Sequence, residues 1–261
     1  MPRSTDRRHF LKAIAAAALA APASAALPAA AQGRSARAIL LAAYENWRAD
    51  SSHAVITMTI RRAGRTRTLT LESWTSGRDK ALVRFTAPPR DAGNATLQLG
   101  AATYVFNPKL NQVIKLPASA MSQSWMGSDF SYNDLARSQR VVDDYTHRII
   151  GRRQVGGRPA VVIESVPKPR KPVVWGKQVI AVRDDGVLLK VEYFDRLGRR
   201  VRVLEADRIA RLGGRPYPVV MTMRSDARPG QFTRITTRSA EFDIPLPSWL
   251  FTRSNLQNPR N

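Results

Sequence analysis

The sequence has 261 residues, with 42 Lys and Arg against 20 Asp and Glu and a formal net charge of +22 at pH 7. It contains no cysteine, which excludes disulfides, a cysteine nucleophile and the acylated cysteine of a lipoprotein. Its length is enough for a short leader followed by one domain of about 230 residues that buries its own core.

The first 31 residues are typical of a secretory signal. Arg7 and Arg8 precede an Ala-rich apolar run over residues 13–21, and small residues follow this run. The run is shorter than the about 20 residues that a membrane span requires. We expect cleavage after Ala25 or after Ala31, where the sequence has small residues in an A-x-A arrangement.

The arginine pair, followed by Phe10-Leu11-Lys12, favours the twin-arginine export route. Asp6 precedes the pair where Ser or Thr is more typical, so ordinary Sec export stays open. Both routes lead to the periplasm. We therefore expect a signal peptide over residues 1–31 and a single periplasmic domain over residues 32–261.

The basic charge belongs mainly to the predicted domain. The leader carries a net charge of +3, which leaves +19 for the remaining chain, and 34 of the 42 basic residues are Arg. Export and the dispersal of these arginines argue against nucleic acid as a partner. Transient contact with an anionic membrane surface is the expected use of this charge, since each basic residue near such a surface contributes about 1 kcal/mol. A genomic bias towards Arg accounts for the charge equally well.

An amphipathic helix opens the predicted domain, and Ser35 is placed to cap it. Large and small apolar residues recur at helical spacing along one face. This face consists of Ile39, Leu40, Ala43, Tyr44 and Trp47.

After this helix the apolar period changes to two. Ile56, Met58 and Ile60 alternate with Val and Thr, and Leu69 and Leu71 repeat the pattern after a turn at Ala63-Gly64. Short strands separated by Gly-rich turns predict a mainly β meander of antiparallel pairs. The further expected strands cover residues 80–86, 94–99, 102–106, 112–116, 143–152, 159–166, 175–183, 187–194, 200–212, 217–224 and 231–242.

Some of these strands are more apolar than a sheet with one buried face requires. Residues 54–60 alternate Ile and Met with Val and Thr, and residues 187–194 carry apolar side chains at nearly every position. A curled sheet with such a lining would enclose an apolar space, whereas interdigitation of the same side chains would give a packed core. Periodicity does not separate these two outcomes.

Residues 125–135, which we call the aromatic segment, place large apolar side chains among small polar ones. Gly127 and Ser128 are expected to loosen its backbone, and Ser131 with Asp134 three residues later is a variant of the capping box. Such a segment suits either a lid over a hydrophobic opening or a plug in the core. Its large side chains are Trp125, Met126, Phe130, Tyr132 and Leu135.

The sequence lacks the residue patterns of an enzyme. The predicted domain has two histidines, His53 and His147, without metal-ligand spacing, and it has neither a nucleophile elbow nor a P-loop. Asp129 and Asp134 flank a predicted helix, where capping explains them more simply than catalysis. We expect no catalytic residue, no metal and no cofactor.

The aromatic segment also resembles the "MGSDFsYeDL" signature of the outer-membrane lipoprotein-sorting family, relatives of the periplasmic carrier LolA. Residues 82–95 are similar to the "Ri.F..P.d..Gta" stretch of that family, and residues 104–117 to its "wlYlPalkrvrri" stretch. Phe251-Thr252 and the later Leu256 resemble its closing "F....L". The chain departs from the pattern at Asn94, where Gly is common, and at Asn107, where Leu is common.

This resemblance implies an incomplete antiparallel β-barrel with an N-terminal helix and a short helical lid around a hydrophobic cavity. It also implies a periplasmic carrier that shuttles acyl chains of lipids or lipoproteins towards the outer membrane, together with an inner-membrane transporter. The alternatives are a lipid-responsive envelope sensor with the same fold and, from a third class, a hydrolase of envelope polymers. The cavity and lid residues expected on this basis are Ile56, Met58, Ile60, Leu69, Leu71, Phe85, Trp125, Met126, Phe130, Tyr132 and Leu135.

Overall fold

The computed structural model describes residues 33–137, 140–171 and 173–260. Within it, the described residues from 34 onwards form one compact unit. The signal peptide predicted over residues 1–31 lies outside the described residues. None of the helices in the described part of the chain has the length and apolarity needed to span a membrane.

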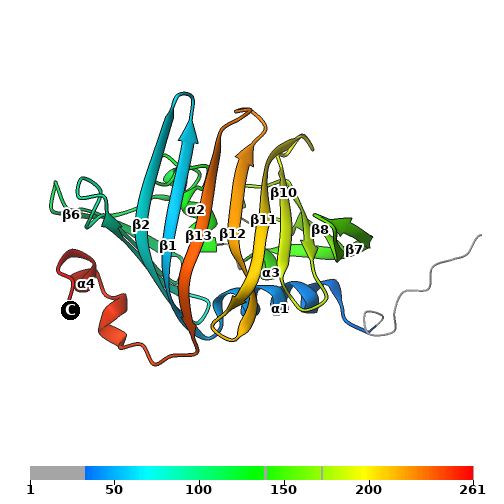
Figure 1. The fold of residues 1–261 in the computed structure, drawn as a ribbon, viewed down its shortest axis with the longest axis horizontal. Helices are drawn as coiled ribbons and strands as arrows, with labels where there is room; N and C mark the ends of the chain where they lie inside the picture. The colour runs from blue at the N-terminus through cyan, green and yellow to red at the C-terminus, as the bar shows by residue number, and fades with distance from the viewer. Residues whose placement is uncertain (1–32, 138–139, 172, 261) are drawn as a thin grey trace, which may run out of the picture. The chain divides into compact units, whose positions relative to one another are not determined.

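The unit is built on one antiparallel sheet of thirteen strands in the order β6-β5-β4-β3-β2-β1-β13-β12-β11-β10-β9-β8-β7 (Figure 1). The edge strands β6 and β7 have no ladder between them in the described residues, so the sheet stays open. The strands are β1 (Ser51–Arg62), β2 (Arg65–Ser76), β3 (Lys80–Ala87), β4 (Ala95–Leu99), β5 (Ala102–Asn107), β6 (Gln112–Lys115), β7 (Tyr145–Val155), β8 (Arg158–Pro167), β9 (Lys177–Val182), β10 (Leu188–Phe194), β11 (Arg200–Leu212), β12 (Arg215–Ser225) and β13 (Phe232–Phe242).

This architecture confirms the prediction of a mainly β fold with an incomplete antiparallel barrel. Every expected strand is present, with one difference at the start of β7. Residues 143 and 144 were expected to be extended, but they end the short helix α3 (Val141–Asp144). Val141 and Val142 are buried against α1, and the N–H of Tyr145 closes the turn on the carbonyl of Val141, which explains the difference.

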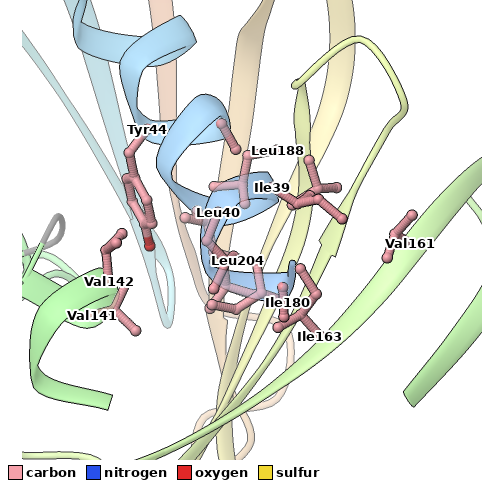
Figure 2. Close-up of a cluster of buried hydrophobic side chains, with 14 of the residues drawn as sticks. Ile39, Leu40, Tyr44, Val141, Val142, Val161, Ile163, Ile180, Leu188 and Leu204 are labelled. Carbon is pink, nitrogen blue, oxygen red and sulfur yellow. The ribbon is translucent and has the colours of Figure 1, made fainter. Parts of the chain in front are cut away.

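The predicted N-terminal helix is α1 (Ala36–Arg48), and its cap is confirmed. The Ser35 hydroxyl accepts a hydrogen bond from the Ala38 N–H at 3.2 Å. The apolar face of the helix packs against strands β8 to β12, and Figure 2 shows Leu40 directed towards Leu204 and Ile180. We call the face of the sheet that α1 covers the inner face.

The remaining helices are short. Figure 1 shows α2 behind strands β1 and β13, and α3 behind the sheet near the lower part of β11. The C-terminal helix packs against β4, β5 and β6, with Phe251 and Leu256 buried against Leu82 and Leu97. This packing gives a physical reason for the closing Phe and Leu of the sequence pattern. These elements are α2 (Tyr132–Arg137), η2 (Ala118–Ala120), η4 (Ser248–Phe251) and α4 (Arg253–Gln257).

Candidate functional site: a cavity beneath the aromatic segment

A cavity of about 260 Å³ lies between the inner face of the sheet, α1 and the aromatic segment. Its walls come from both halves of the sheet, since residues of β1 to β5 and of β9 to β13 line it. Helix α1 contributes Tyr44, Trp47 and Arg48, and the aromatic segment contributes Trp125, Phe130 and Leu135. Segments that are far apart in the sequence therefore build one site.

The register of strands β1 to β5 explains where this space opens. Residues in register on one face lie about 5 Å apart, so each inner-facing residue belongs to a cross-strand row. The apolar row consists of large side chains: Ile56, Leu71 and Phe85. The small row next to it consists of Ala54, Ser73, Val83 and Thr96. The polar row beyond that consists of Ser52, Thr75, Ala81, Gln98 and Thr103.

The cavity is the consequence of this change in size. Met58 and Leu69, in the next row beyond the apolar row, are fully buried and fill the interior. In the small row the backbone spacing is the same, but most of the side chains are shorter than those of the apolar row, and the polar row continues this wall. Unfilled volume remains, and these rows line it.

Tyrosine side chains from three other elements complete the walls. Burial raises the pKa of the Tyr44, Tyr193 and Tyr217 phenols, that of Tyr217 to about 12. These shifts indicate an environment of low polarity, in which a charge without a partner is disfavoured. The space is therefore suited to apolar ligand groups.

The eleven residues predicted to form the cavity and lid belong to one cluster in the structure. Ile56, Leu71, Trp125, Phe130 and Leu135 line the cavity. Four others are buried in the packed interior and do not line the cavity: Met58, Ile60, Leu69 and Phe85. Met126 and Tyr132 are partly buried against the cluster and do not line the cavity either. Their role in ligand binding stays a prediction.

Two aromatic residues of the segment have different environments. Trp125 is 4% exposed, its ring lies 5.1 Å from that of Phe85, and its indole N–H donates a hydrogen bond to Thr96 Oγ1 at 3.2 Å. Phe130 is half-buried and packs against two hydrophobic clusters, one beneath α1 and one on β1 to β3. Trp125 is therefore an anchor in the sheet, while Phe130 lies between the two clusters and lines the cavity.

Polar contacts hold the segment to the sheet through Asp129, whose side chain is 2% exposed. Its carboxylate accepts hydrogen bonds from Arg62 at 3.0 Å and Thr233 at 2.8 Å, and it forms an ion pair with Arg228 at 2.8 Å. The Gly127 carbonyl accepts a further bond from Arg62 at 2.9 Å. Arg62 thus holds the Gly127 carbonyl in this position, and the looseness expected at Gly127 and Ser128 stays a prediction.

Asp134 has two functions in this arrangement. Its carboxylate accepts bonds from the N–H and hydroxyl of Ser131 at 2.7 and 2.8 Å, which confirms the capping box. It also forms a buried ion pair with Arg202 of β11, whose guanidinium lies 4.2 Å from the Trp175 ring and 4.3 Å from the Tyr193 ring. Burial alone would lower the pKa of Arg202, but Asp134 keeps it above its ordinary value.

Arg202 also donates to the Asp129 carbonyl at 3.0 Å, and Arg67 donates to the Met126 carbonyl at 3.2 Å. We call Arg62, Arg67, Arg202 and Arg228 the arginine clamp. Sequence reasoning did not identify these partners, because they lie 59 or more positions from the residues they hold. The acidic residues of the segment were the available signal, since a buried carboxylate requires a cation or several donors.

In the described part of the chain, no group of three His, Asp or Glu side chains could hold a metal ion. His53 instead contacts Glu72 at 2.9 Å, and His147 contacts Ser165 at 2.9 Å. Both histidines thus have local structural partners on neighbouring strands.

Comparison with known proteins places this geometry among related folds. A protein-family model described as "Uncharacterized protein" matches residues 77–258. A DUF1329 family protein from Desulfovibrio piger has a TM-score of 0.78 and 24% identity, over 85% of this chain and 97% of that chain. No curated protein sequence matches the chain significantly.

Two further structures carry names that describe lipoprotein sorting. A domain from Vibrio parahaemolyticus named for outer membrane lipoprotein sorting has a TM-score of 0.74 and 24% identity, over 85% of this chain and 98% of that chain. A LolA superfamily protein from Nitrosomonas europaea has a TM-score of 0.71 and 20% identity, over 85% and 99%. These likenesses show the fold, and they confirm the resemblance predicted from the aromatic segment.

Replacement of Arg202 by Met should release the aromatic segment from β11. The variant leaves the buried Asp134 carboxylate without its cation, and breaking such a pair typically costs about 3–5 kcal/mol. We expect a lower melting temperature and faster amide hydrogen exchange in the segment than elsewhere. Arg200→Met, on the same strand but in exposed ion pairs, is the matched control and should cost less than about 1 kcal/mol. Equal effects of the two variants would contradict the clamp.

Proposed function

The chain belongs to the protein family whose model matches residues 77–258, with LolA superfamily proteins among its fold neighbours, and on this premise we propose that it binds acyl chains of lipids or lipoproteins as a carrier. The observation that carries the proposal is an apolar cavity beneath a segment that ion pairs and hydrogen bonds attach to the sheet, in addition to its hydrophobic contacts. A packed core would have neither the unfilled volume nor a separately fastened cover.

The energetics of binding are favourable for such a cargo. Burying one methylene yields about 0.8 kcal/mol, so a 16-carbon chain would gain on the order of 10 kcal/mol. The loss of translational and rotational freedom offsets a good part of this gain. The net affinity is the difference between these two opposing contributions.

In this proposal, the aromatic segment is a lid. The cavity of about 260 Å³ is smaller than the roughly 300–1,000 Å³ typical of ligand pockets, so a long acyl chain would enter only when the segment moves outward. Phe130 and Leu135 would then line the enlarged space, together with Ile56 and Leu71 of the sheet. Release of the cargo would return the lid to the arginine clamp.

We further propose a periplasmic location and three kinds of partner. The leader would direct export, and the cargo would be handed over by an inner-membrane transporter and carried towards the outer membrane. Arginines outside the clamp would make transient contact with anionic membrane surfaces, where each basic residue contributes about 1 kcal/mol.

Lipid bound to the protein isolated from its native periplasm tests the proposed function. Mass spectrometry of the solvent extract should find acyl lipid at near-stoichiometric amounts. An extract without lipid, from a protein purified with a tightly bound protein partner, would favour the sensor alternative instead.

Replacement of Phe130 by Ala separates a lid from a plug. A fully buried Phe typically costs about 3–5 kcal/mol when truncated, and Phe85→Ala serves as this comparator because Phe85 is 1% exposed. Phe130→Ala should cost much less, and it should accelerate the uptake of a fluorescent acyl probe. A melting shift as large as that of Phe85→Ala with unaltered uptake would return the segment to the packed core.

N-terminal sequencing of the periplasmic protein tests export. The first residue should follow Ala25 or Ala31, because small residues end the predicted leader. An intact Met1 would contradict the prediction. Replacement of Arg7 and Arg8 by Lys should block export if the twin-arginine route is used and leave it unchanged if the Sec route is used.

A further inference from the structure

The polar row forms one end of the cavity, away from the large side chains of the apolar row. Ser52 and Thr75 satisfy each other through a hydrogen bond of 2.7 Å between their hydroxyls. Ala81 separates this pair from Gln98 and Thr103, which stand opposite each other on β4 and β5. All four polar residues line the cavity, but only Ser52 and Thr75 are hydrogen-bonded to each other.

Gln98 and Thr103 are buried without full satisfaction of their polar groups. Gln98 is 5% exposed and Thr103 is 2% exposed. Neither Gln98 Oε1 nor Thr103 Oγ1 has a hydrogen-bond partner among the described residues, and Gln98 Nε2 reaches only the Gly100 carbonyl at 3.4 Å. Most buried polar groups in proteins are hydrogen-bonded, and one left without a partner costs about 1–3 kcal/mol.

Arg48 supplies a charge near the same end. It is the last residue of α1, and its Nη2 donates to the carbonyls of Lys80 at 3.0 Å and Gly77 at 3.3 Å, at the turn between β2 and β3. Its Nε has no partner in the described structure, although the side chain lines the cavity. Burial lowers its pKa to about 10 and Asp79 opposes this effect, so the guanidinium stays charged at neutral pH.

We propose that Gln98, Thr103 and Arg48 form a subsite for an oxygen-acceptor group at the polar end of the ligand, such as a carboxylate or a phosphate ester. The proposal rests on the carrier function and gives the cargo an orientation. Arg48 and the Thr103 hydroxyl would donate to the acceptor oxygens, while Gln98 Oε1, itself an acceptor, would take a hydrogen bond from a hydroxyl of the polar group where it carries one. The acyl tail would extend past the small row towards Ile56 and Leu71.

Other polar groups on the cavity wall do not offer such a site. Thr96 accepts the bond from the Trp125 indole, and the Tyr145 hydroxyl donates to the Trp175 carbonyl at 3.2 Å. The Trp175 indole N–H, on the opposite wall, lacks a partner among the described residues, but it stands alone. Arg48, Gln98 and Thr103, from α1, β4 and β5, each line the cavity and each carry a polar atom without a partner among the described residues.

The test compares ligands of equal tail length that differ in their polar group. Binding of diphenylhexatriene, a fluorescent hydrocarbon, measures the apolar cavity, and its displacement by dodecanoate, dodecyl phosphate and dodecanol measures the subsite. The variant Gln98→Met/Thr103→Val removes two polar groups at nearly constant volume. Thr68→Val on the exposed side of β2 is the control.

The wild type should bind dodecanoate or dodecyl phosphate more tightly than dodecanol, because only the anions pair with Arg48. In the double variant, displacement by the anions should weaken at least about fivefold, while diphenylhexatriene affinity is unchanged. The anion that loses more affinity identifies carboxylate or phosphate as the preferred group. The control should match the wild type.

Three results would overturn the subsite. Equal binding of dodecanol and both anions to the wild type would remove the role of Arg48. Unchanged anion affinity in the double variant, or an equal loss for hydrocarbon and anions, would show that Gln98 and Thr103 do not recognise a polar group. If the wild type binds neither diphenylhexatriene nor the anions, the carrier function itself fails, which distinguishes the two proposals.

Discussion

The register of strands β1 to β5 is the constraint on which the site depends. It aligns large side chains in the apolar row, short ones in the small row and hydrogen-bonding ones in the polar row. Because strands stand at fixed spacing, the large side chains fill the space beside the sheet and the shorter ones leave part of it empty. The cavity lies beside the shorter side chains. A slip of one residue would turn all three rows to the outer face and remove the cavity.

The second requirement is a cover that polar contacts as well as hydrophobic packing attach to the sheet. Hydrophobic packing alone would make the aromatic segment a plug, since its release would expose the whole buried cluster. The arginine clamp instead places two carboxylates, Asp129 and Asp134, against guanidinium groups of the sheet. Replacing buried ion pairs of this kind by well-packed apolar side chains often costs little stability. The ion pairs nevertheless hold the segment in one geometry. Such a cover has a defined closed position and polar groups that water can solvate when it opens.

Much of this fold follows from local patterns in the sequence. Apolar patterns and turn residues predicted twelve or so strands, where the sheet of the described residues has thirteen, and Ser35 and Ser131 marked two helix starts. The continuous apolar run at 187–194 is explained by burial on both faces, since Leu188 and Val191 belong to the inner cluster and Leu189 belongs to a second cluster. Partners across the chain were not predictable, because pairing register and long-range ion pairs leave no local signal. Arg202, which the sequence presents as one arginine among many, therefore became recognisable only in the folded chain.

Photo-crosslinking with a diazirine-labelled fatty acid tests most directly whether acyl chains occupy the cavity. After irradiation and proteolysis, mass spectrometry locates the modified residues. We expect adducts on cavity-lining residues such as Ile56, Leu71 and Phe130, and competition by unlabelled fatty acid. Adducts confined to exposed apolar residues such as Leu110 and Leu197 would contradict it, because they would show that lipid contacts only the outer surface.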